Sequence, residues 1–237
     1  MKKEEKIGLL LSMIFLFTNV FSQTCELDSK KINNQEKTAK TYLDLMINIE
    51  STNLNYGRSN TMLTDYKKPV KGLQAGVSFQ AGITSRFSVV SELYFMKKGG
   101  KLMVNNPLYT NESTLRLNTL ELPVLARLHF GKFIHVGKFY VNAGPSIAYN
   151  LSGKRKIGDQ TTKLSFHNSS DGFKRFDAGI QMGGGVEFPL KQNRIALDIR
   201  YNYGLSNIAY NEEIYNRALM VSVHFSKAWK TNPLEKK

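Results

Sequence analysis

The sequence predicts an all-β fold: a closed antiparallel up-and-down transmembrane β-barrel of about eight strands. Apolar and polar residues alternate with a period of two through most of the chain, which places successive side chains on opposite faces of a sheet. The connections between the alternating segments are long and short in turn. Lysines gather in these connections, while the polar faces of the segments carry many small and neutral residues.

The first 22 residues have the pattern of a secretory signal peptide. A charged start with a basic excess precedes an almost wholly apolar run from Ile7 to Phe17. This run is short for a spanning helix, which needs about 20 residues, although an N-terminal membrane anchor is the alternative interpretation. We expect cleavage near Ser22, export of the mature chain, and a polar periplasmic linker over residues 23–40.

Eight segments carry the alternation, and most have about the 9–11 residues that a tilted strand needs to cross a bilayer. They cover residues 42–50, 72–81, 87–96, 119–130, 138–150, 175–188, 195–205 and 218–225. Each segment is predicted by a row of alternate apolar residues, and these rows begin in order with Leu43, Leu73, Phe87, Leu120, Phe139, Phe176, Ile195 and Leu219. The barrel is therefore expected over residues 41–225, with a periplasmic tail over residues 226–237.

The connections between these segments fit the same fold. Residues 51–71, 97–116 and 151–173 are long, residues 206–216 are of middle length, and residues 82–86, 131–137 and 189–194 are short. Outer-membrane barrels have short periplasmic turns and long extracellular loops. An even number of strands with a periplasmic N-terminus produces this order.

A soluble barrel of the lipocalin type would also alternate, so the chemistry of the two faces must decide between the alternatives. A water-facing polar face would normally carry many Lys and Glu, whereas Gly179, Gly183 and Gly185 share the polar face of one segment. The apolar faces carry aromatic residues near many segment ends, which suits the aromatic girdles of a membrane barrel. These observations favour the outer membrane of a Gram-negative cell.

Five short motifs are similar to those of a known family. They are Ser91-Glu92-Leu93-Tyr94-Phe95-Met96-Lys97-Lys98-Gly99-Gly100, Leu120-Glu121-Leu122-Pro123-Val124-Leu125, Ala143-Gly144-Pro145, Gly185-Val186-Glu187-Phe188-Pro189 and Arg200-Tyr201-Asn202-Tyr203-Gly204-Leu205. In this order and spacing they resemble the PorT-type outer-membrane β-barrels, a porin-like family. The resemblance implies the barrel fold and, from the member that names the family, a role beside a type IX secretion and gliding apparatus. The first strand lacks the glycine-rich start of the family, and the chain continues beyond the aromatic Phe225.

Charged residues on the inward face form the first candidate site. The alternation places there Glu92, Glu121, Arg127, Asp177, Glu187, Asp198 and Arg200, together with Arg175. They could form a polar conduit or ligand site, or a paired network that fills the barrel. Eight strands leave an interior just wide enough for side chains or one small ligand, and an unpaired buried charge is costly. The paired network is therefore the favoured interpretation.

Basic residues in the predicted long loops form the second candidate site, and they are Lys97, Lys98, Lys101, Lys154, Arg155 and Lys156. They could contact lipopolysaccharide phosphates or could be ordinary solvated loop residues, and the sequence leaves both interpretations open. The net charge of +14 could indicate nucleic acid, but export argues against that partner. We expect outer-membrane lipid, lipopolysaccharide and other envelope proteins as partners of a monomeric barrel.

Catalytic and metal-binding patterns are scarce in the sequence. Cys25 is the only cysteine, the four histidines are not clustered at metal-ligand spacing, and no G-x-S-x-G motif occurs. His129 and His224 fall on inward positions, where a hydrogen-bonded filler is the usual role. We expect a barrel without cofactor or metal that is not an enzyme and has a structural or protein-interaction role. A narrow small-solute pore and a lipid-active enzyme are the alternatives.

Overall fold

The computed structural model describes residues 40–58, 60–133, 137–169, 172–190, 193–229 and 233–234. All of them belong to the compact unit formed by residues 39–237. The predicted signal peptide, its cleavage site and nearly all of the predicted linker lie outside the described residues. Among the residues described, no helix is both long enough and apolar enough to span a membrane.

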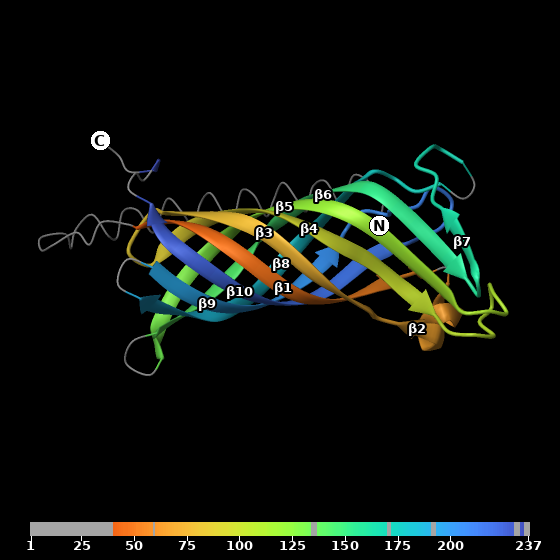
Figure 1. The fold of residues 1–237 in the computed structure, drawn as a ribbon, viewed down its shortest axis with the longest axis horizontal. Coiled ribbons are helices and arrows are strands. Elements are labelled where there is room, and N and C mark those ends of the chain that lie inside the picture. The colour runs from red at the N-terminus through yellow and green to blue at the C-terminus, as the bar shows by residue number, and fades with distance from the viewer. Residues whose placement is uncertain are drawn as a thin grey trace, which may run out of the picture. The chain divides into compact units, whose positions relative to one another are not determined.

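Eight strands form one closed antiparallel sheet, which confirms the predicted fold class (Figure 1). The strands are β1 (Thr41–Asn55), β3 (Val70–Gly82), β4 (Phe87–Leu102), β5 (Ser113–Phe133), β6 (Gly137–Ile157), β8 (Phe176–Leu190), β9 (Asn193–Gly204) and β10 (Tyr215–Trp229). Each strand pairs with the next one along the chain. The sheet closes through β1 and β10, which pair from Thr41↔Trp229 to Asn55↔Tyr215.

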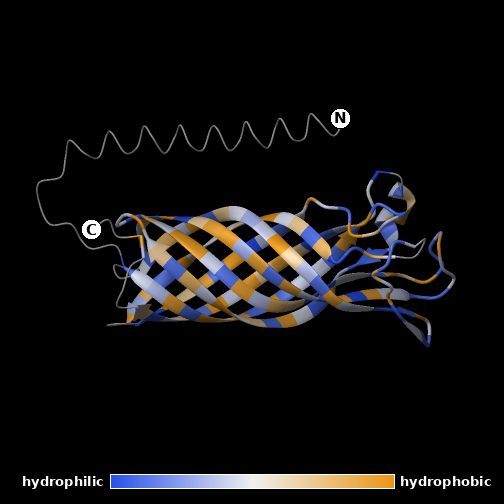
Figure 2. Ribbon diagram, turned by 90° about the horizontal axis from the view of Figure 1, so that it is seen from above, coloured by the Kyte–Doolittle hydropathy of each residue, from blue (hydrophilic) through white to orange (hydrophobic). Residues whose placement is uncertain are grey.

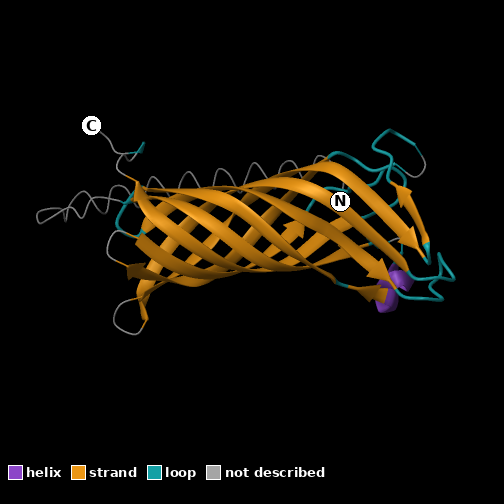
Figure 3. Ribbon diagram, viewed as in Figure 1, coloured by secondary structure: helices purple, strands orange, loops and turns teal. Residues whose placement is uncertain are grey.

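The two ends of the barrel differ in the length of their connections. At one end, called here the short-turn end, β3, β5 and β8 run through brief turns into β4, β6 and β9. The other end is the long-loop end, where the 3-10 helix η1 (Thr61–Tyr66) and the short strands β2 (Lys67–Lys68) and β7 (Gln160–Lys163) lie (Figure 3). Strand β2 pairs with β4, and β7 pairs with β6.

The outer and inner faces of the barrel have opposite chemistry. On β1, the side chains of Leu43, Leu45, Ile47 and Ile49 are exposed, and the residues between them are buried inside the barrel. The other strands repeat this arrangement, which gives the ribbon its alternating apolar and polar bands (Figure 2). A continuous apolar outer face is what a hydrocarbon environment requires, because lipid cannot solvate polar groups.

Several strands are longer than the sequence predicted. Strand β4 continues to Leu102, β5 begins at Ser113 and β6 continues to Ile157, so parts of the predicted connections 97–116 and 151–173 are strand. Beyond the apolar outer face the ladder continues with Lys, Arg and Gly residues, and the alternation that reveals a strand in the sequence disappears. Strand β10 likewise reaches Trp229, and Ser226, predicted to begin the tail, lies buried inside the barrel.

The wall opens between β3 and β4 toward the long-loop end. The ladder described between these strands covers Ala75–Gly82 and Ser88–Phe95. Closer to the long-loop end, β3 remains paired with β1 and β4 remains paired with β5. The Glu50 carboxylate of β1 accepts a 3.1 Å hydrogen bond from the backbone N–H of Lys97. This hydrogen bond satisfies a backbone donor that has lost its partner in β3 where the two strands diverge. A side chain at Gly100 would collide with Leu54, so this glycine allows β1 to approach β4.

The ladders on both sides of β5 are interrupted next to prolines, Pro123 of β5 on the β4 side and Pro145 of β6 on the β6 side. Toward β4 the pairing passes from Ser91↔Val124 to Tyr94↔Glu121, and toward β6 it passes from Pro123↔Ser146 to Ala126↔Ala143. Proline has no backbone N–H and cannot donate to a ladder. Pro123 and Pro145 therefore account for the two local gaps in the pairing.

We predict that Ile47→Arg lowers the free energy of unfolding from a lipid bilayer by about 2–4 kcal/mol, because Ile47 lies centrally in the apolar row of β1. Its side chain is 56% exposed to the surroundings of the barrel. The control is Ile83→Arg at the short-turn end, where the isoleucine side chain is 45% exposed. This substitution is expected to lower the free energy of unfolding by only about 0–1 kcal/mol, because it lies near the membrane interface. Denaturant titration of protein refolded in vesicles measures both values, and equal costs for the two variants would contradict the assigned outer face.

Candidate functional site in the barrel lumen

The barrel lumen contains more carboxylates than lysine and arginine side chains. The acidic residues are Asp44, Glu50, Glu92, Glu121, Asp177, Glu187 and Asp198, and the cations are Lys98, Arg127, Arg194 and Arg200. Each strand delivers these groups from alternate positions, so they point at one another across the enclosed space. Three clusters follow one another from the short-turn end to the long-loop end.

The Arg194 cluster lies near the short-turn end and consists of Asp44, Gln80, Glu187, Arg194 and His129. Arg194 donates to Glu187 at 2.8 Å and to the side-chain oxygen of Gln80 at 2.6 Å, and it lies 3.5 Å from Asp44. The Nε2 atom of His129 lies 3.1 Å from Glu187. One guanidinium group therefore joins side chains from β1, β3, β8 and β9.

The Arg200 cluster fills the middle of the lumen and consists of Glu92, Asp198, Arg200, Tyr140 and Asn142. Arg200 donates to Glu92 at 2.7 Å and to Asp198 at 2.6 Å. Tyr140 and Asn142 both donate to the second oxygen of Asp198, at 2.8 and 2.9 Å.

Arg127 connects the first two clusters. It donates to Gln80 at 2.9 Å, and its guanidinium lies 4.1 Å above the ring of Tyr140. A cation over an aromatic ring gains electrostatic stabilisation when both are removed from water.

The Lys98 cluster lies toward the long-loop end and consists of Lys98, Glu121, Asp177, Asn202 and Asn216. The ammonium of Lys98 lies 2.8 Å from Glu121 and 3.1 Å from Asp177. Asn202 donates to Glu121 at 2.6 Å, and Asn216 donates to Asp177 at 2.7 Å. The remaining lumen carboxylate, Glu50, accepts hydrogen bonds from Gln74 and from the backbone of Lys97.

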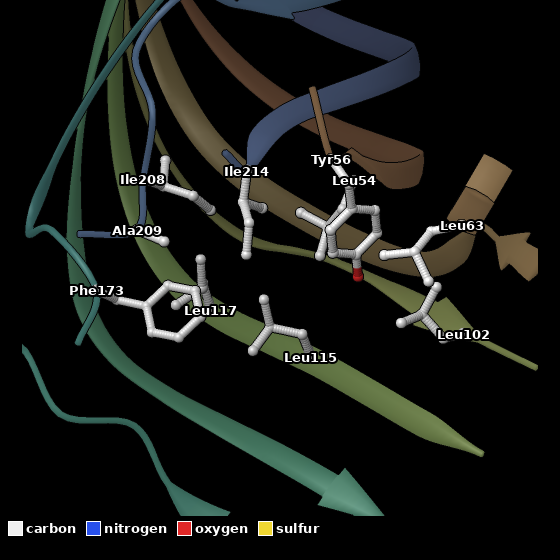
Figure 4. Close-up of a cluster of buried hydrophobic side chains, with 10 residues drawn as sticks. All are labelled: Leu54, Tyr56, Leu63, Leu102, Leu115, Leu117, Phe173, Ile208, Ala209 and Ile214. Carbon is white, nitrogen blue, oxygen red and sulfur yellow. The ribbon is translucent and has the colours of Figure 1, made fainter. Parts of the chain in front are cut away.

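Ten apolar side chains close the lumen above the Lys98 cluster and form the apolar plug: Leu54, Tyr56, Leu63, Leu102, Leu115, Leu117, Phe173, Ile208, Ala209 and Ile214 (Figure 4). They come from the strand ends at the long-loop end and from the long loops, which therefore share a small core. Burial raises the pKa of Tyr56 above its ordinary value, so its hydroxyl stays neutral within the plug. Arg155 lies at the margin, where it donates to the Tyr109 hydroxyl at 3.2 Å.

The structure places all seven predicted lumen residues, Glu92, Glu121, Arg127, Asp177, Glu187, Asp198 and Arg200, inside the barrel and joins them in the hydrogen-bonded clusters above. The prediction for Arg175 was wrong, because this side chain is exposed and donates to the backbone of Asn150. Sequence reasoning did not select Asp44, Glu50 or Arg194, although all three follow the alternation of their strands. It did not select Lys98 for the lumen either, because the apolar pattern of β4 ends before that residue.

The predicted loop cations divide into three groups. Lys98 is 3% exposed and ion-paired inside the barrel, so the prediction that it lies on a loop and meets headgroups was wrong. Lys101 pairs with Glu112 at 2.5 Å, and Arg155 turns toward Tyr109. Lys97, Lys154 and Lys156 are exposed.

A β-bulge at Leu151 decides which of the basic residues of β6 face the interior. The register of β5 and β6 passes from Thr119↔Asn150 to Asn118↔Ser152, so Leu151 is an extra residue. Without it, the even-numbered positions of β6 would continue inward and would carry Lys154 and Lys156 into the barrel. The shift turns both lysines outward.

His224 is buried, and its Nδ1 atom lies 3.8 Å from Asp44, a distance too long for a direct hydrogen bond. No group of three or more His, Cys, Asp or Glu side chains in the described part of the chain is arranged to hold a metal ion.

Comparison with known proteins identifies one family and several solved structures. Residues 42–210, more than half of the chain, match the outer membrane protein beta-barrel domain family. Similar structures include Neisserial surface protein A (11% identity, 79% of this chain and 97% of that chain, TM-score 0.47). They also include OprG from Pseudomonas aeruginosa (10%, 83% and 98%, 0.48) and Ail from Yersinia pestis (10%, 79% and 99%, 0.42). No curated protein matches the chain.

We predict that Lys98→Met costs about 3–5 kcal/mol of unfolding free energy, because it leaves the Glu121 and Asp177 carboxylates buried without their shared cation. Glu121→Gln removes one of the excess carboxylates and is expected to cost less. The double variant should be more stable than the sum of the two single losses predicts, which a double-mutant cycle of denaturant titrations measures. Strictly additive losses would show that Lys98 and Glu121 do not act as a pair.

Proposed function

The chain belongs to the outer membrane protein beta-barrel domain family, and on this premise we propose that it is a non-conducting barrel with a structural or protein-interaction role. The family locates the barrel in the outer membrane. We infer that its short turns face the periplasm and its long loops face outward, as is general for outer-membrane barrels. The single observation that carries the proposal is the packing of the lumen. Arg127 is 0% and Arg200 is 1% exposed, so the middle of the barrel is filled by side chains.

Two layers oppose the passage of ions. The side chains of the lumen clusters are hydrogen-bonded to one another across the enclosed space. Above them the apolar plug adds a layer in which an ion would lose its hydration without gaining polar partners. A small-solute pore would need both layers to move, so it is the weaker alternative.

A lipid-active enzyme is the third candidate, and the burial of the histidines argues against it. His224 is buried, and His129 is already hydrogen-bonded to Glu187 and close to the backbone oxygen of Arg86. A catalytic base must reach both a nucleophile and a substrate. We therefore propose that the protein is not an enzyme and works without a cofactor or nucleic-acid partner.

The interaction role is assigned to the long loops, because binding residues concentrate on loops held by a rigid scaffold. The buried plug gives these loops a common core, which supports a defined outer surface. We extend the proposal to export by a signal peptide and to a monomeric barrel that contacts lipid and other envelope proteins. The resemblance to PorT-type barrels supports a finer proposal, that the protein is an accessory to a secretion or gliding apparatus.

We predict that the refolded protein shows no discrete ion-conductance steps in planar bilayers. Leu117→Ser/Ile214→Ser, which weakens the plug, is also expected to be silent because the lumen clusters below still fill the barrel. A porin measured in the same bilayers controls for incorporation, and a shift in electrophoretic mobility on boiling checks that each protein is folded. Steady conductance steps of the wild-type protein would contradict the proposal and favour a pore.

We predict that cells lacking this chain secrete less protein and that the wild-type chain restores secretion. Lys97→Glu/Lys154→Glu/Lys156→Glu, which reverses three exposed cations at the long-loop end, is expected to fold but to restore secretion poorly. Lys138→Glu near the short-turn end is the control and should restore it fully. Secretion that is unchanged without the chain would rule out the accessory role while leaving the barrel assignment intact.

A further inference from the structure

A groove of about 390 Å³ lies on the outer wall at the long-loop end. Its walls come from the parts of β1 and β10 nearest the long-loop end, from Tyr201 of β9 and from the segment that contains Lys67 and Pro69. The groove opens on the outer face, because Asn53 and Leu219 occupy positions that alternate with buried ones, and its inner side reaches the buried Leu54 and Ala218. Its volume is within the range of small-molecule sites.

The divergence of β3 creates this groove. The last register pair between β1 and β3 is Thr52↔Val70, and the residues just before β3 pair with β4 instead, through Lys67↔Leu102. Residues 53–55 of β1 therefore have β10 on one side and the segment that enters β3 on the other. The η1 and β2 segment lies at the long-loop end of the barrel (Figure 1).

The groove lies where the apolar outer face changes to a polar one. On β1 the exposed apolar row ends at Ile49, and Ser51, Asn53 and Asn55 continue the outward positions. Leu219 and Tyr201 keep large exposed side chains at the groove. A ligand there would meet an apolar wall on one side and a polar wall on the other, as at the border between acyl chains and headgroups.

Two cations belong to the groove, Lys67 and Arg217, and no carboxylate is among its described lining residues. Arg217 is held in place because its Nη1 atom donates to the backbone oxygens of Gly204 at 2.7 Å and Asn216 at 2.8 Å. Its guanidinium also stacks 3.6 Å from the centre of the Tyr203 ring. Lys71 is exposed beside the groove, since it pairs in register with Ser51. A fixed guanidinium with further cations suits a phosphate group.

We propose that this groove binds a phosphorylated lipid of the outer leaflet, with a phosphate between Lys67 and Arg217 and an acyl chain along Leu219 and Tyr201. The residues differ from the loop cations that the sequence singled out. The charge of the groove selects an anion, and the change from an apolar to a polar wall selects an amphipathic one. The binding is independent of whether the lumen conducts or the loops recognise a protein partner.

Native mass spectrometry of the refolded full chain in detergent tests the proposal with lipid A that carries two phosphates. The wild-type protein is expected to retain one lipid. Lys67→Gln/Arg217→Gln should weaken retention by roughly tenfold or more, because it removes two charge-assisted hydrogen bonds to the phosphate. The matched control is Lys154→Gln/Lys163→Gln, which removes the same charge from exposed positions on β6 and β7 and should bind like the wild type. Lys67→Gln alone serves if the double variant does not show the heat-dependent shift of a folded barrel.

Four outcomes would overturn the proposal. Equal retention by the groove variant and the wild type would show that the lipid binds elsewhere, and an equal loss in both double variants would indicate general charge attraction. Equal retention of lipid A without phosphates would show that an acyl contact alone is responsible. Inorganic phosphate is included as a competitor, and displacement of the lipid at equal concentration would identify a free-phosphate site rather than a lipid site.

Discussion

Closure of the sheet between β1 and β10 is the constraint on which the other features depend. Once every strand has two neighbours, most backbone groups are satisfied within the wall, and the outer face can be apolar. The same closure encloses the inner face in a space that only side chains can fill. The charged residues of that face must therefore satisfy one another, which is why Arg194, Arg200 and Lys98 each join several strands.

The alternation of residues was enough to predict the barrel, because lipid outside and polar packing inside impose the period of two directly. It was a poor guide to strand ends. Between the apolar outer face and the long-loop end, the outward residues no longer face lipid, so nothing requires an apolar residue at every second position. The ladders of β4, β5 and β6 therefore continue where the alternating pattern stops. The bulge at Leu151 is invisible for the same reason, since it depends on the register with Asn118 and Thr119.

The candidate site was predictable in composition but not in its pairing. Alternation within one strand brings Glu121, Asp198 and Arg200 inside, whereas the partner of each group is set by neighbours far apart in the sequence. Lys98 and Asp177 illustrate this limit, because their contact needs strands β4 and β8 on opposite sides of the lumen. Arg175 failed as a prediction because it precedes β8, where the alternation of that strand does not yet apply.

The apolar plug has a consequence for how the outer surface can change during evolution. Loops of membrane barrels are usually free to vary, but here Phe173, Ile208 and Ile214 are buried with strand residues. Mutations at these anchors would open a cavity in a small shared core, and the loops that carry them would lose their common support. Substitutions in the exposed stretches between the anchors leave this core intact, so the surface chemistry of the loops can change without loss of their framework.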